Sequence, residues 1–365
     1  MILMNKNTEV LEFSLEDMYL RVINNSLLPY ELKDYIKTTD PLDFKKSMID
    51  LSIFKDFLAS RVILLSRENA KAILNVAALP QSLKTEDRIK IVMACHGLSM
   101  IDNFWIRDDE DDRSFDEVNL RKNRLSSVCY EIALLGKNIL ATSKELIPEL
   151  STLGMSPKCW VRENGTVKLI KTDRMKGLAG TLAEIESSRM LSFTDANIVK
   201  YDRIDKDGLI LSSSDCISTD ELSLVHASSI RDWCVHTNRD FLDYVCSNFK
   251  TEFANMVVAD YVIGNTDRHF ENWGFLVDSN NEIKAFAPLY DFDLSLLIDE
   301  THGELDTLIY EPTGLTFKKG MVKYSRNATL DFSKVTNMSK EVFKRTIIYE
   351  KLRDQASYAI KSMFP

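Results

Sequence analysis

The sequence predicts an α+β fold, with a mostly helical N-terminal region, a strand-containing region after it and a C-terminal region of helices around a hairpin, and its length suggests two or three domains or lobes. Apolar residues recur at helical spacing through the first 150 residues. A strand, loop and strand pattern then ends at Lys171. An apolar helical run that stops at Gly264-Asn265 is followed by a β-hairpin. The expected ranges are 1–149, 150–216 and 217–365.

The stretch from Ala259 to Leu294 carries the densest set of polar residues that could perform chemistry. A polar loop after the helix contains Asp267 and Asn272. The hairpin, with strands at 273–277 and 283–287, should return the chain to this loop and bring Asp291 beside it. Two carboxylates and a carboxamide are therefore expected to lie close together at one site.

This set suits phosphoryl transfer of the protein-kinase type, in which a loop Asp accepts the substrate proton and an Asn and a second Asp hold Mg²⁺. Hard cations prefer oxygen ligands. Asp267 is the candidate base, and Asn272 and Asp291 are the candidate Mg²⁺ ligands. His269 lies between base and ligand and is expected to support the loop by hydrogen bonding. Singly, Asp267 and Asn272 could be turn-capping residues; their ordered combination favours catalysis.

The same residues resemble a known family. Asn265-Thr-Asp-Arg-His-x-x-Asn272, followed by Pro288-Leu-Tyr-Asp-Phe292, resembles the catalytic and metal-binding segments of HipA-like serine/threonine kinases. The resemblance covers roughly residues 150–365 and is sharpest over 264–293. It implies a two-lobed kinase-like fold, with a small β-containing lobe and a mainly helical large lobe. It also implies use of ATP and Mg²⁺, and a protein substrate with a serine or threonine acceptor. Because the founding members are toxins of bacterial toxin–antitoxin pairs, it also implies an antitoxin-type protein partner.

The segment from Ser151 to Lys158 is a weak phosphate-binding signal by itself. It has one glycine, Gly154, and the chain contains neither G-x-G-x-x-G nor Walker A. Gly154 would let the backbone approach phosphates, with successive N–H groups forming an anion site. The resemblance places Gly154 and Lys158 in the family's phosphate loop, and it places Ser151 near a serine that some members autophosphorylate.

Lys171 lies on an otherwise apolar strand face, after Val167 and Leu169. Burying an unpaired ammonium is costly, so this lysine needs either a partner or a solvent-exposed strand end. In kinases the strand lysine contacts ATP phosphates and pairs with a helix Glu. Glu184 is the candidate partner, in a segment that resembles the family's E-x-x-x-S-R-x-L helix, and Glu186 is the alternative.

Several helices are expected outside the candidate site. Ser14-x-x-Asp17 has the form of a capping box opening a helix to about Asn24. Helical periodicity covers 51–65, 68–79 and 88–100, with Asp87 as the N-cap of the last, and in the large lobe 224–249 and 252–263. A final amphipathic helix should open at Ser339 and align Phe343, Ile347, Ile348, Leu352, Ala356 and Ile360.

Composition indicates a soluble cytoplasmic protein. The net charge of −9 argues against direct nucleic-acid binding, which favours a basic face. The six cysteines contain no C-x-x-C pair and are expected as buried thiols of a reducing compartment. The N-terminus lacks the apolar length of a signal peptide, and no run approaches the roughly 18 apolar residues of a membrane span.

Two other classes of function remain open on the sequence. One is a metal-dependent phosphodiesterase or phosphatase built on Asp267, His269, Asn272, Asp291 and Asp293. Such sites use several His ligands, and this chain has five His, widely spaced. The other is a pseudokinase that binds a partner without turnover. Its catalytic set would be expected to be incomplete, whereas here Lys171, Glu184 and the three loop residues are all present.

Overall fold

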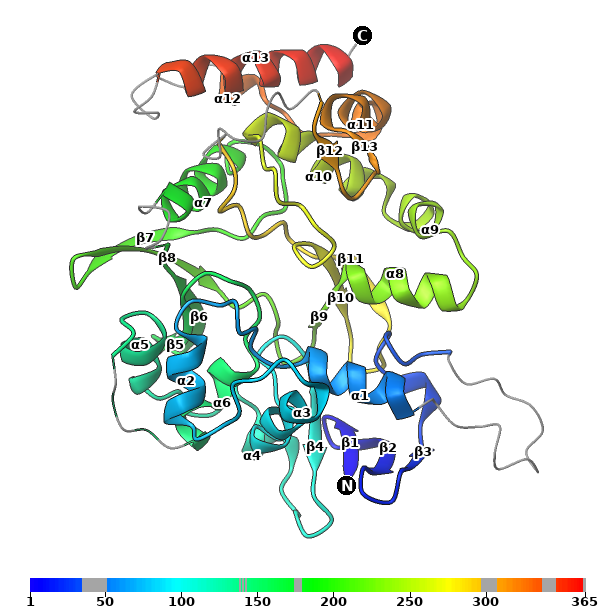
Figure 1. The fold of residues 1–365 in the computed structure, drawn as a ribbon. Coiled ribbons are helices and arrows are strands. Elements are labelled where there is room, and N and C mark those ends of the chain that lie inside the picture. The colour runs from blue at the N-terminus through cyan, green and yellow to red at the C-terminus, as the bar shows by residue number, and fades with distance from the viewer. Residues whose placement is uncertain are drawn as a thin grey trace.

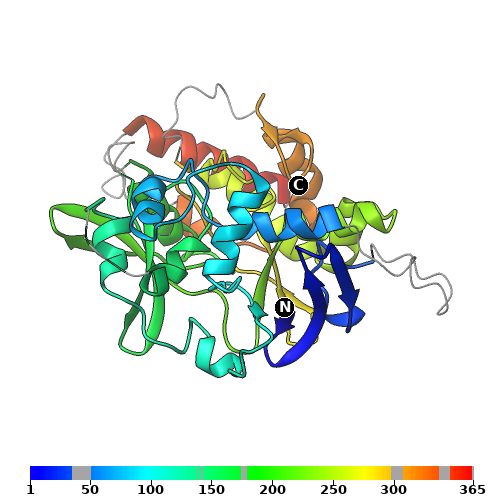
Figure 2. The same ribbon diagram turned by 60° about the horizontal axis from the view of Figure 1, so that its bottom comes forward.

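The computed structural model describes residues 1–34, 51–137, 139, 141, 143–173, 179–296, 307–336 and 346–363. It has the predicted α+β, two-lobed architecture (Figure 1). The N-terminal sheet lies at one end of the molecule and α13 (Thr346–Met363) at the other (Figure 1). Figure 2 turns the N-terminal sheet toward the viewer.

The chain begins with a four-stranded antiparallel sheet, so the helix predicted from Ser14 to about Asn24 is wrong. The sheet order is β3-β2-β1-β4, with β1 Ile2–Asn5, β2 Thr8–Ser14, β3 Tyr19–Val22 and β4 Phe104–Arg107. The Ser14 hydroxyl donates to Asp17 Oδ2 (2.7 Å) and accepts from the Asp17 N–H (3.2 Å), which closes a hairpin turn. Serine forms the same local bonds in a turn and at a helix N-cap. Leu11 and Phe13, two residues apart, are both buried, as expected for alternate residues on the inner face of a strand.

Six helices separate and follow the strands of this region: α1 Leu51–Ser60, α2 Ala70–Val76, α3 Thr85–Ala94, α4 Phe115–Val118, α5 Val128–Ala133 and α6 Ser143–Leu150. The first three confirm predicted helices, although α1 ends before Leu65, α2 is shorter than expected, and α3 begins before Arg88 and ends at Ala94 rather than Met100. The prediction of Asp87 as N-cap is wrong. Lys84 is the N-cap, and Asp87 lies in the first turn of α3, where a carboxylate favours the helix dipole.

The small-lobe sheet has the order β5-β6-β8-β7 and is antiparallel throughout. Its strands are β5 Lys158–Glu163, β6 Thr166–Lys171, β7 Asp202–Lys206 and β8 Leu209–Asp215, and α7 (Ala179–Leu191) lies beside it (Figure 1). Cys159, Ile170 and Leu211 of this sheet share one hydrophobic core with Leu3 and Phe54 of the N-terminal region. The N-terminal region therefore packs directly on the small lobe.

The large lobe starts with a strand where a helix was predicted. Residues 223–226 form β9 (Ser223–His226), which pairs with β10 (Gly274–Val277), and β11 (Ile283–Phe286) completes this sheet. A Cβ at Gly274 would lie 2.1 Å from the Val225 carbonyl oxygen, so this pairing requires the glycine. The expected single helix over 224–249 is instead two helices, α8 (Ala227–His236) and α9 (Phe241–Asn248).

The buried centre of the large lobe is α10 (Lys250–Ile263), in which every residue from Phe253 onward except Asn255 is buried. It ends, as predicted, at Gly264 in the left-handed conformation. The remaining elements are β12 Ile309–Tyr310, β13 Leu315–Thr316, α11 Phe317–Tyr324, α12 Ser333–Thr336 and α13.

The predicted final amphipathic helix corresponds in part to α13. Ser339 and Phe343 lie outside the described residues, as do the side chains of Ile347, Ile348 and Leu352. Ala356 is buried in the large-lobe core, and Ile360 packs against that core. The described part of the helix therefore has the expected apolar face.

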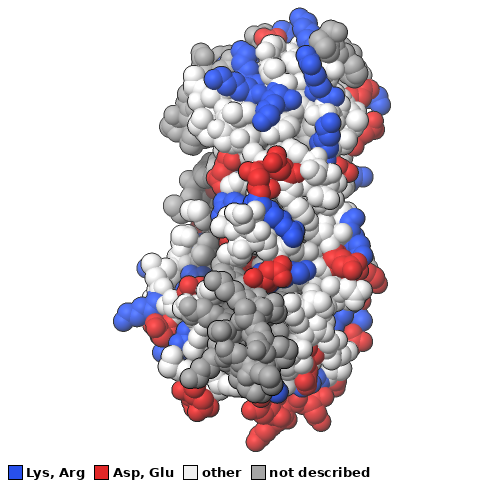
Figure 3. Space-filling model, turned by 90° about the vertical axis from the view of Figure 1, so that its right-hand side faces the viewer, with Lys and Arg blue, Asp and Glu red and all other residues white. Residues whose placement is uncertain are grey.

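Charge is unevenly distributed over the face drawn in Figure 3. Lysines and arginines gather at the large-lobe end, and acidic side chains dominate the opposite end. Over the described residues, no helix is long and apolar enough to cross a membrane.

Candidate active site

Strand register places two lysines and a serine on one face of the small-lobe sheet. Lys158 on β5 lies directly opposite Lys171 on β6, and Ser212 on β8 lies opposite Lys171 from the other side. Residues directly opposite in an antiparallel pair project to the same face. The sheet therefore presents two ammonium groups and a hydroxyl toward α7 and the large lobe.

Lys171 connects three parts of the chain. Its Nζ lies 2.7 Å from Glu184 Oε1 on α7 and 2.7 Å from Asp291 Oδ1, which follows the large-lobe hairpin. Ser212 donates to the second oxygen of Glu184 (2.6 Å). The alternative helix carboxylate, Glu186, lies 3.9 Å from Arg189 instead. The structure thus pairs Lys171 with Glu184.

The charges of this cluster are set by burial and by each other. Burial disfavours the Lys171 ammonium, but Asp291 and Glu184 outweigh it and raise the pKa of Lys171 above its ordinary value. Burial likewise opposes ionisation of Asp291, yet Lys171 and then Lys158 hold the pKa of Asp291 well below its usual range. Burial, followed by repulsion from Lys171, lowers the pKa of Lys158 to about 8. Of the two lysines, Lys158 is therefore the one whose ammonium the cluster disfavours.

Asp291 is held in an uncommon backbone conformation. Its φ is 60°, in the left-handed region that side-chain-bearing residues rarely adopt. Its N–H donates to the Tyr201 hydroxyl (3.1 Å). Non-glycine residues in this region cluster at functional sites, where the surrounding structure maintains the strain.

A buried arginine, Arg268, ties the two candidate metal-binding segments together. Its guanidinium makes a bidentate ion pair with Asp260 of α10 (2.9 and 3.0 Å), and neither side chain is exposed. One nitrogen, Nη1, donates both to the Asn272 carbonyl and to the Tyr290 carbonyl (2.6 Å). Two carbonyls that share one donor must lie close together, so Asn272 and the residue before Asp291 are neighbours in space.

The loop that carries Asp267 is fixed by its own polar groups. The Asn272 amide nitrogen donates to the Asp267 carbonyl (2.9 Å), which leaves the amide oxygen as the atom suited to a cation. The Asp267 N–H donates to Asn265 Oδ1 (3.2 Å). His269 accepts from the Glu271 N–H at Nδ1 (3.2 Å) and from the Asn272 N–H at its carbonyl (2.9 Å). Its Nε2 lies 3.9 Å from Asp267 Oδ2.

The segment 151–157, called here the phosphate loop after the role that the sequence predicts for it, passes close to the Lys158 ammonium at Gly154. Gly154 has φ +93°, and a Cβ there would lie 2.2 Å from Lys158 Nζ. The backbone conformation therefore favours glycine, and a Cβ there would displace the end of the Lys158 side chain. The Ser156 hydroxyl donates to Asp293 Oδ2 (3.2 Å), which connects the loop to the large lobe.

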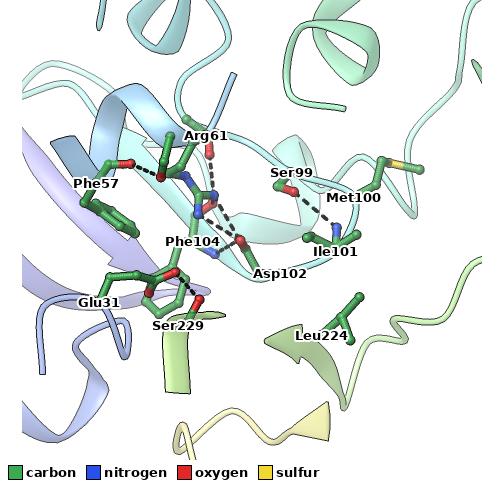
Figure 4. Close-up of polar contacts among 12 residues, drawn as sticks. Glu31, Phe57, Arg61, Ser99, Met100, Ile101, Asp102, Phe104, Leu224 and Ser229 are labelled. Carbon is green, nitrogen blue, oxygen red and sulfur yellow. Dashed lines mark hydrogen bonds and ion pairs between the residues drawn. The ribbon is translucent and has the colours of Figure 1, made fainter. Parts of the chain in front are cut away.

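Ser151 lies at the start of this loop, away from the lysine cluster. It is buried, and its hydroxyl donates to the Pro148 carbonyl (3.4 Å). It lines a hollow of about 640 Å³, counting the part open to solvent, between the N-terminal region and β9. Figure 4 shows the polar wall of this hollow, where Arg61 forms an ion pair with Asp102 (2.8 Å). The described residues lining the hollow do not include the lysine cluster.

The oxygen atoms of Asn272 and Asp291 can be compared with the ligands that metal ions prefer. Among the residues that the structure describes, no group of three or more His, Cys, Asp and Glu could hold a metal ion. Mg²⁺ is usually held by one or two protein carboxylates or amides, with phosphates and water completing its shell. Asn272 and Asp291, one amide and one carboxylate, fit this pattern for Mg²⁺. Among the described residues, no cluster of the His-rich kind that a metal-dependent hydrolase would need is found.

Sequence reasoning missed the support of the site, namely Asp260, Arg268 and Tyr310. The Tyr310 hydroxyl donates to Asp260 Oδ2 (2.6 Å), and the Asn265 amide donates to Oδ1 (3.0 Å). The available signal was a lone carboxylate within the apolar run 253–263. A buried charge of that kind requires a partner, and Arg268 lies close by in the sequence.

Comparison with known proteins identifies the class. Residues 152–362 match the family described as phosphatidylinositol 3- and 4-kinase, which is more than half of the chain, and the chain belongs to that family. The serine/threonine-protein kinase CtkA of Helicobacter pylori is 50% identical over 42 residues, 12% of this chain. The chain matches only 13% of the length of that relative.

Two solved structures are also similar. The HipA–HipB–operator DNA complex from Shewanella oneidensis MR-1 aligns with 99% of this chain and 96% of its own, at 11% identity and a TM-score of 0.52. The H. pylori kinase CtkA aligns with 57% of this chain and 89% of its own, at 16% identity and a TM-score of 0.43. The predicted kinase-like fold and the HipA resemblance are confirmed at the level of fold. The likeness extends beyond the predicted range 150–365 into the N-terminal region.

Proposed function

We propose that this protein is an ATP- and Mg²⁺-dependent serine/threonine protein kinase. The observation that carries the proposal is the buried ion-pair cluster, in which Lys171 bridges Glu184 of α7 and Asp291 of the large lobe. A lysine held by a helix glutamate beside a metal-binding aspartate is the arrangement that phosphoryl transfer of the kinase type requires. Membership of a kinase family supports the same class of reaction.

The residues fit both cofactors. Lys158 and Lys171, on one face of the sheet and beside the Gly154 turn, suit a polyphosphate. The Asn272 amide oxygen and the Asp291 carboxylate suit Mg²⁺. When bound, ATP supplies the phosphoryl group and the metal neutralises phosphate charge.

The chain's own residues would then position the reaction. Lys171 orients the phosphates, and Glu184 keeps that ammonium charged and in place. Asp267, with 41% of its side chain exposed, orients the acceptor hydroxyl and takes its proton late in transfer. Arg268 holds the Asn272 and Asp291 segments at a fixed separation. Positioning dominates because the transition state is loose.

The acceptor is the part of the proposal on which the comparisons differ. The family description names inositol lipids, whereas the 42-residue match is to a serine/threonine-protein kinase. The motif from Asn265 to Asn272 favours a protein hydroxyl. The HipA relative was solved with HipB and operator DNA, which supports an antitoxin-type protein partner here. We propose that the protein acts in the cytoplasm and binds neither nucleic acid nor a membrane directly.

A label-transfer assay tests the proposal. Purified protein with radiolabelled ATP and Mg²⁺ should label serine or threonine in itself or in an added protein mixture, but not phosphatidylinositol in vesicles. Asp267→Asn should keep ATP affinity nearly intact and cut turnover by roughly 10²–10⁴, as is typical of losing a general base. Transfer to the lipid, ATP binding without any transfer, or near-normal transfer by Asp267→Asn would each contradict the assignment.

Each of the three regions of the chain has its own role in this proposal. Residues 150–216 would bind nucleotide, and 217–365 would supply the catalytic and metal-binding segments. Residues 1–149 pack on the small lobe and would support it there.

A further inference from the structure

The connection between α1 and α2 reaches the phosphate loop from the N-terminal region. The Ile63 N–H donates to the Leu150 carbonyl (2.7 Å) just before the loop. The Glu68 N–H donates to the Met155 carbonyl (3.0 Å) near its tip. Both the root and the tip of the loop are therefore hydrogen-bonded to one short segment that lies about 90 residues earlier in the chain.

Arg67, between these two residues, holds the two ends of the loop. Its guanidinium pairs with Glu149 at the end of α6 (2.7 Å), and neither side chain is exposed. Nη1 donates to the Thr152 carbonyl (3.2 Å), and Nη2 donates to the Lys158 carbonyl. Thr152 and Lys158 flank Gly154. Only a guanidinium, with its fixed fork of donors, can satisfy acceptors in so many directions.

Glu149 extends the same network into β5. Its second carboxylate oxygen accepts from the Trp160 N–H (3.1 Å). The Trp160 indole nitrogen donates to the Thr152 hydroxyl (2.8 Å), which itself donates to the Pro148 carbonyl (2.5 Å). The end of α6, the loop and the start of β5 are thereby fixed as one unit.

We propose that Arg67, paired with Glu149, is a positioning residue that holds the phosphate loop in its nucleotide-binding conformation. The loop has a single glycine and none of the repeated glycines that preform other phosphate sites, so its shape is imposed by these contacts. Arg67 fixes the Lys158 backbone and thereby the position of the ammonium beside Gly154. This inference rests on the proposed function, because it assigns residues of the N-terminal region to the same nucleotide site.

Arg67→Lys tests the role. Lysine keeps a positive charge against Glu149, but its one nitrogen cannot reach Thr152, Lys158 and Glu149 together. We expect the dissociation constant for Mg·ATP to rise about tenfold, as is typical of losing one or two hydrogen bonds. Turnover at saturating ATP should change less than about twofold, since the catalytic loop is untouched. Amide hydrogen exchange over residues 151–157 should accelerate without nucleotide.

Arg61→Lys is the matched control. Arg61 lies in the same segment, is nearly buried, and has its own carboxylate partner in Asp102 (Figure 4). Its guanidinium also bonds the Gly97 carbonyl (2.8 Å), and its partners within the described part of the chain do not include the phosphate loop. Its replacement should leave ATP affinity and loop exchange unchanged. An equal loss of ATP affinity in Arg61→Lys would overturn the proposal, because general loosening of the region would then explain both.

A second variant covers the case in which Arg67→Lys does not fold. Arg67→Met combined with Glu149→Gln removes both charges, so no buried charge is left unpaired. The Glu149→Gln change retains an oxygen that can accept from the Trp160 N–H. A folded double variant with wild-type ATP affinity and wild-type loop exchange would refute the positioning role. Failure of the wild-type protein to bind ATP would instead refute the proposed function, while loop exchange would still decide the role of Arg67.

Discussion

Arg268 offers a test of the candidate site that does not depend on which substrate is phosphorylated. Its guanidinium bonds Asp260 twice and bonds the Asn272 and Tyr290 carbonyls, all without exposure to solvent. Arg268→Met leaves Asp260 as a buried carboxylate without its cation. Breaking a buried pair in this way costs about 3–5 kcal/mol. The bonds that Asn265 and Tyr310 still donate to Asp260 should keep the loss near the lower end of that range.

Asp260→Asn should cost a similar amount, because the guanidinium is then buried without its carboxylate. The double variant has no unpaired charge. Its loss should therefore fall short of the sum of the single losses by about 1–3 kcal/mol, within the range of coupling between contacting residues. Urea unfolding monitored by tryptophan fluorescence gives the three free energies. Arg189→Met is the control, since Arg189 is 53% exposed and lies 3.9 Å from Glu186; it should change stability by less than about 0.5 kcal/mol.

Additive losses within about 0.5 kcal/mol, or a loss below about 1 kcal/mol for Arg268→Met, would refute the reasoning. Because the same guanidinium fixes both segments that we propose as metal ligands, a folded Arg268→Met protein should also need more Mg²⁺ for activity.

Three further outcomes are expected. Asn272→Ala should raise the Mg²⁺ concentration needed for half-maximal transfer, whereas Asp267→Asn should not, which a metal titration of both variants checks. Because the pKa of Lys158 is lowered to about 8, the side chain is mostly deprotonated above that pH, and phosphate binding should draw a proton onto it. Calorimetry at about pH 8.5 in buffers of different ionisation enthalpy should show proton uptake on ATP binding, absent in Lys158→Met. If Ser151 is an autophosphorylation site, intact-mass analysis of protein made in cells should show an added phosphate that Asp267→Ala protein lacks; the same phosphate on that variant would assign it to another kinase.

The pH dependence has a defined sign. Burial makes the folded protein bind the Lys158 proton less tightly than the unfolded chain, whose lysine has the ordinary pKa of 10.5. The contribution of Lys158 to stability therefore improves as pH rises from about 8 toward 10.5.

The sequence alone determined the features that depend on short-range pattern. The helix ending at Gly264, the hairpin after it and the loop from Asp267 to Asn272 were all readable, because helix stops and turns use local residue chemistry. The place of Lys171 on an apolar strand face indicated that this lysine needs either a partner or an exposed strand end. The choice of Glu184 over Glu186 required the tertiary structure, because it depends on how α7 is rotated against the sheet.

Tertiary structure also decided what local signals leave ambiguous. Ser14 and Asp17 form bonds that suit a helix start or a hairpin turn equally well, and only pairing of β2 with β1 and β3 selects the turn. The contacts of Arg67 with residues 149–158 join two segments far apart in the chain, and neither segment's sequence indicates the other. A buried charge requires a partner of opposite charge, but the sequence does not show which residue forms the ion pair. The packing of the chain decides this.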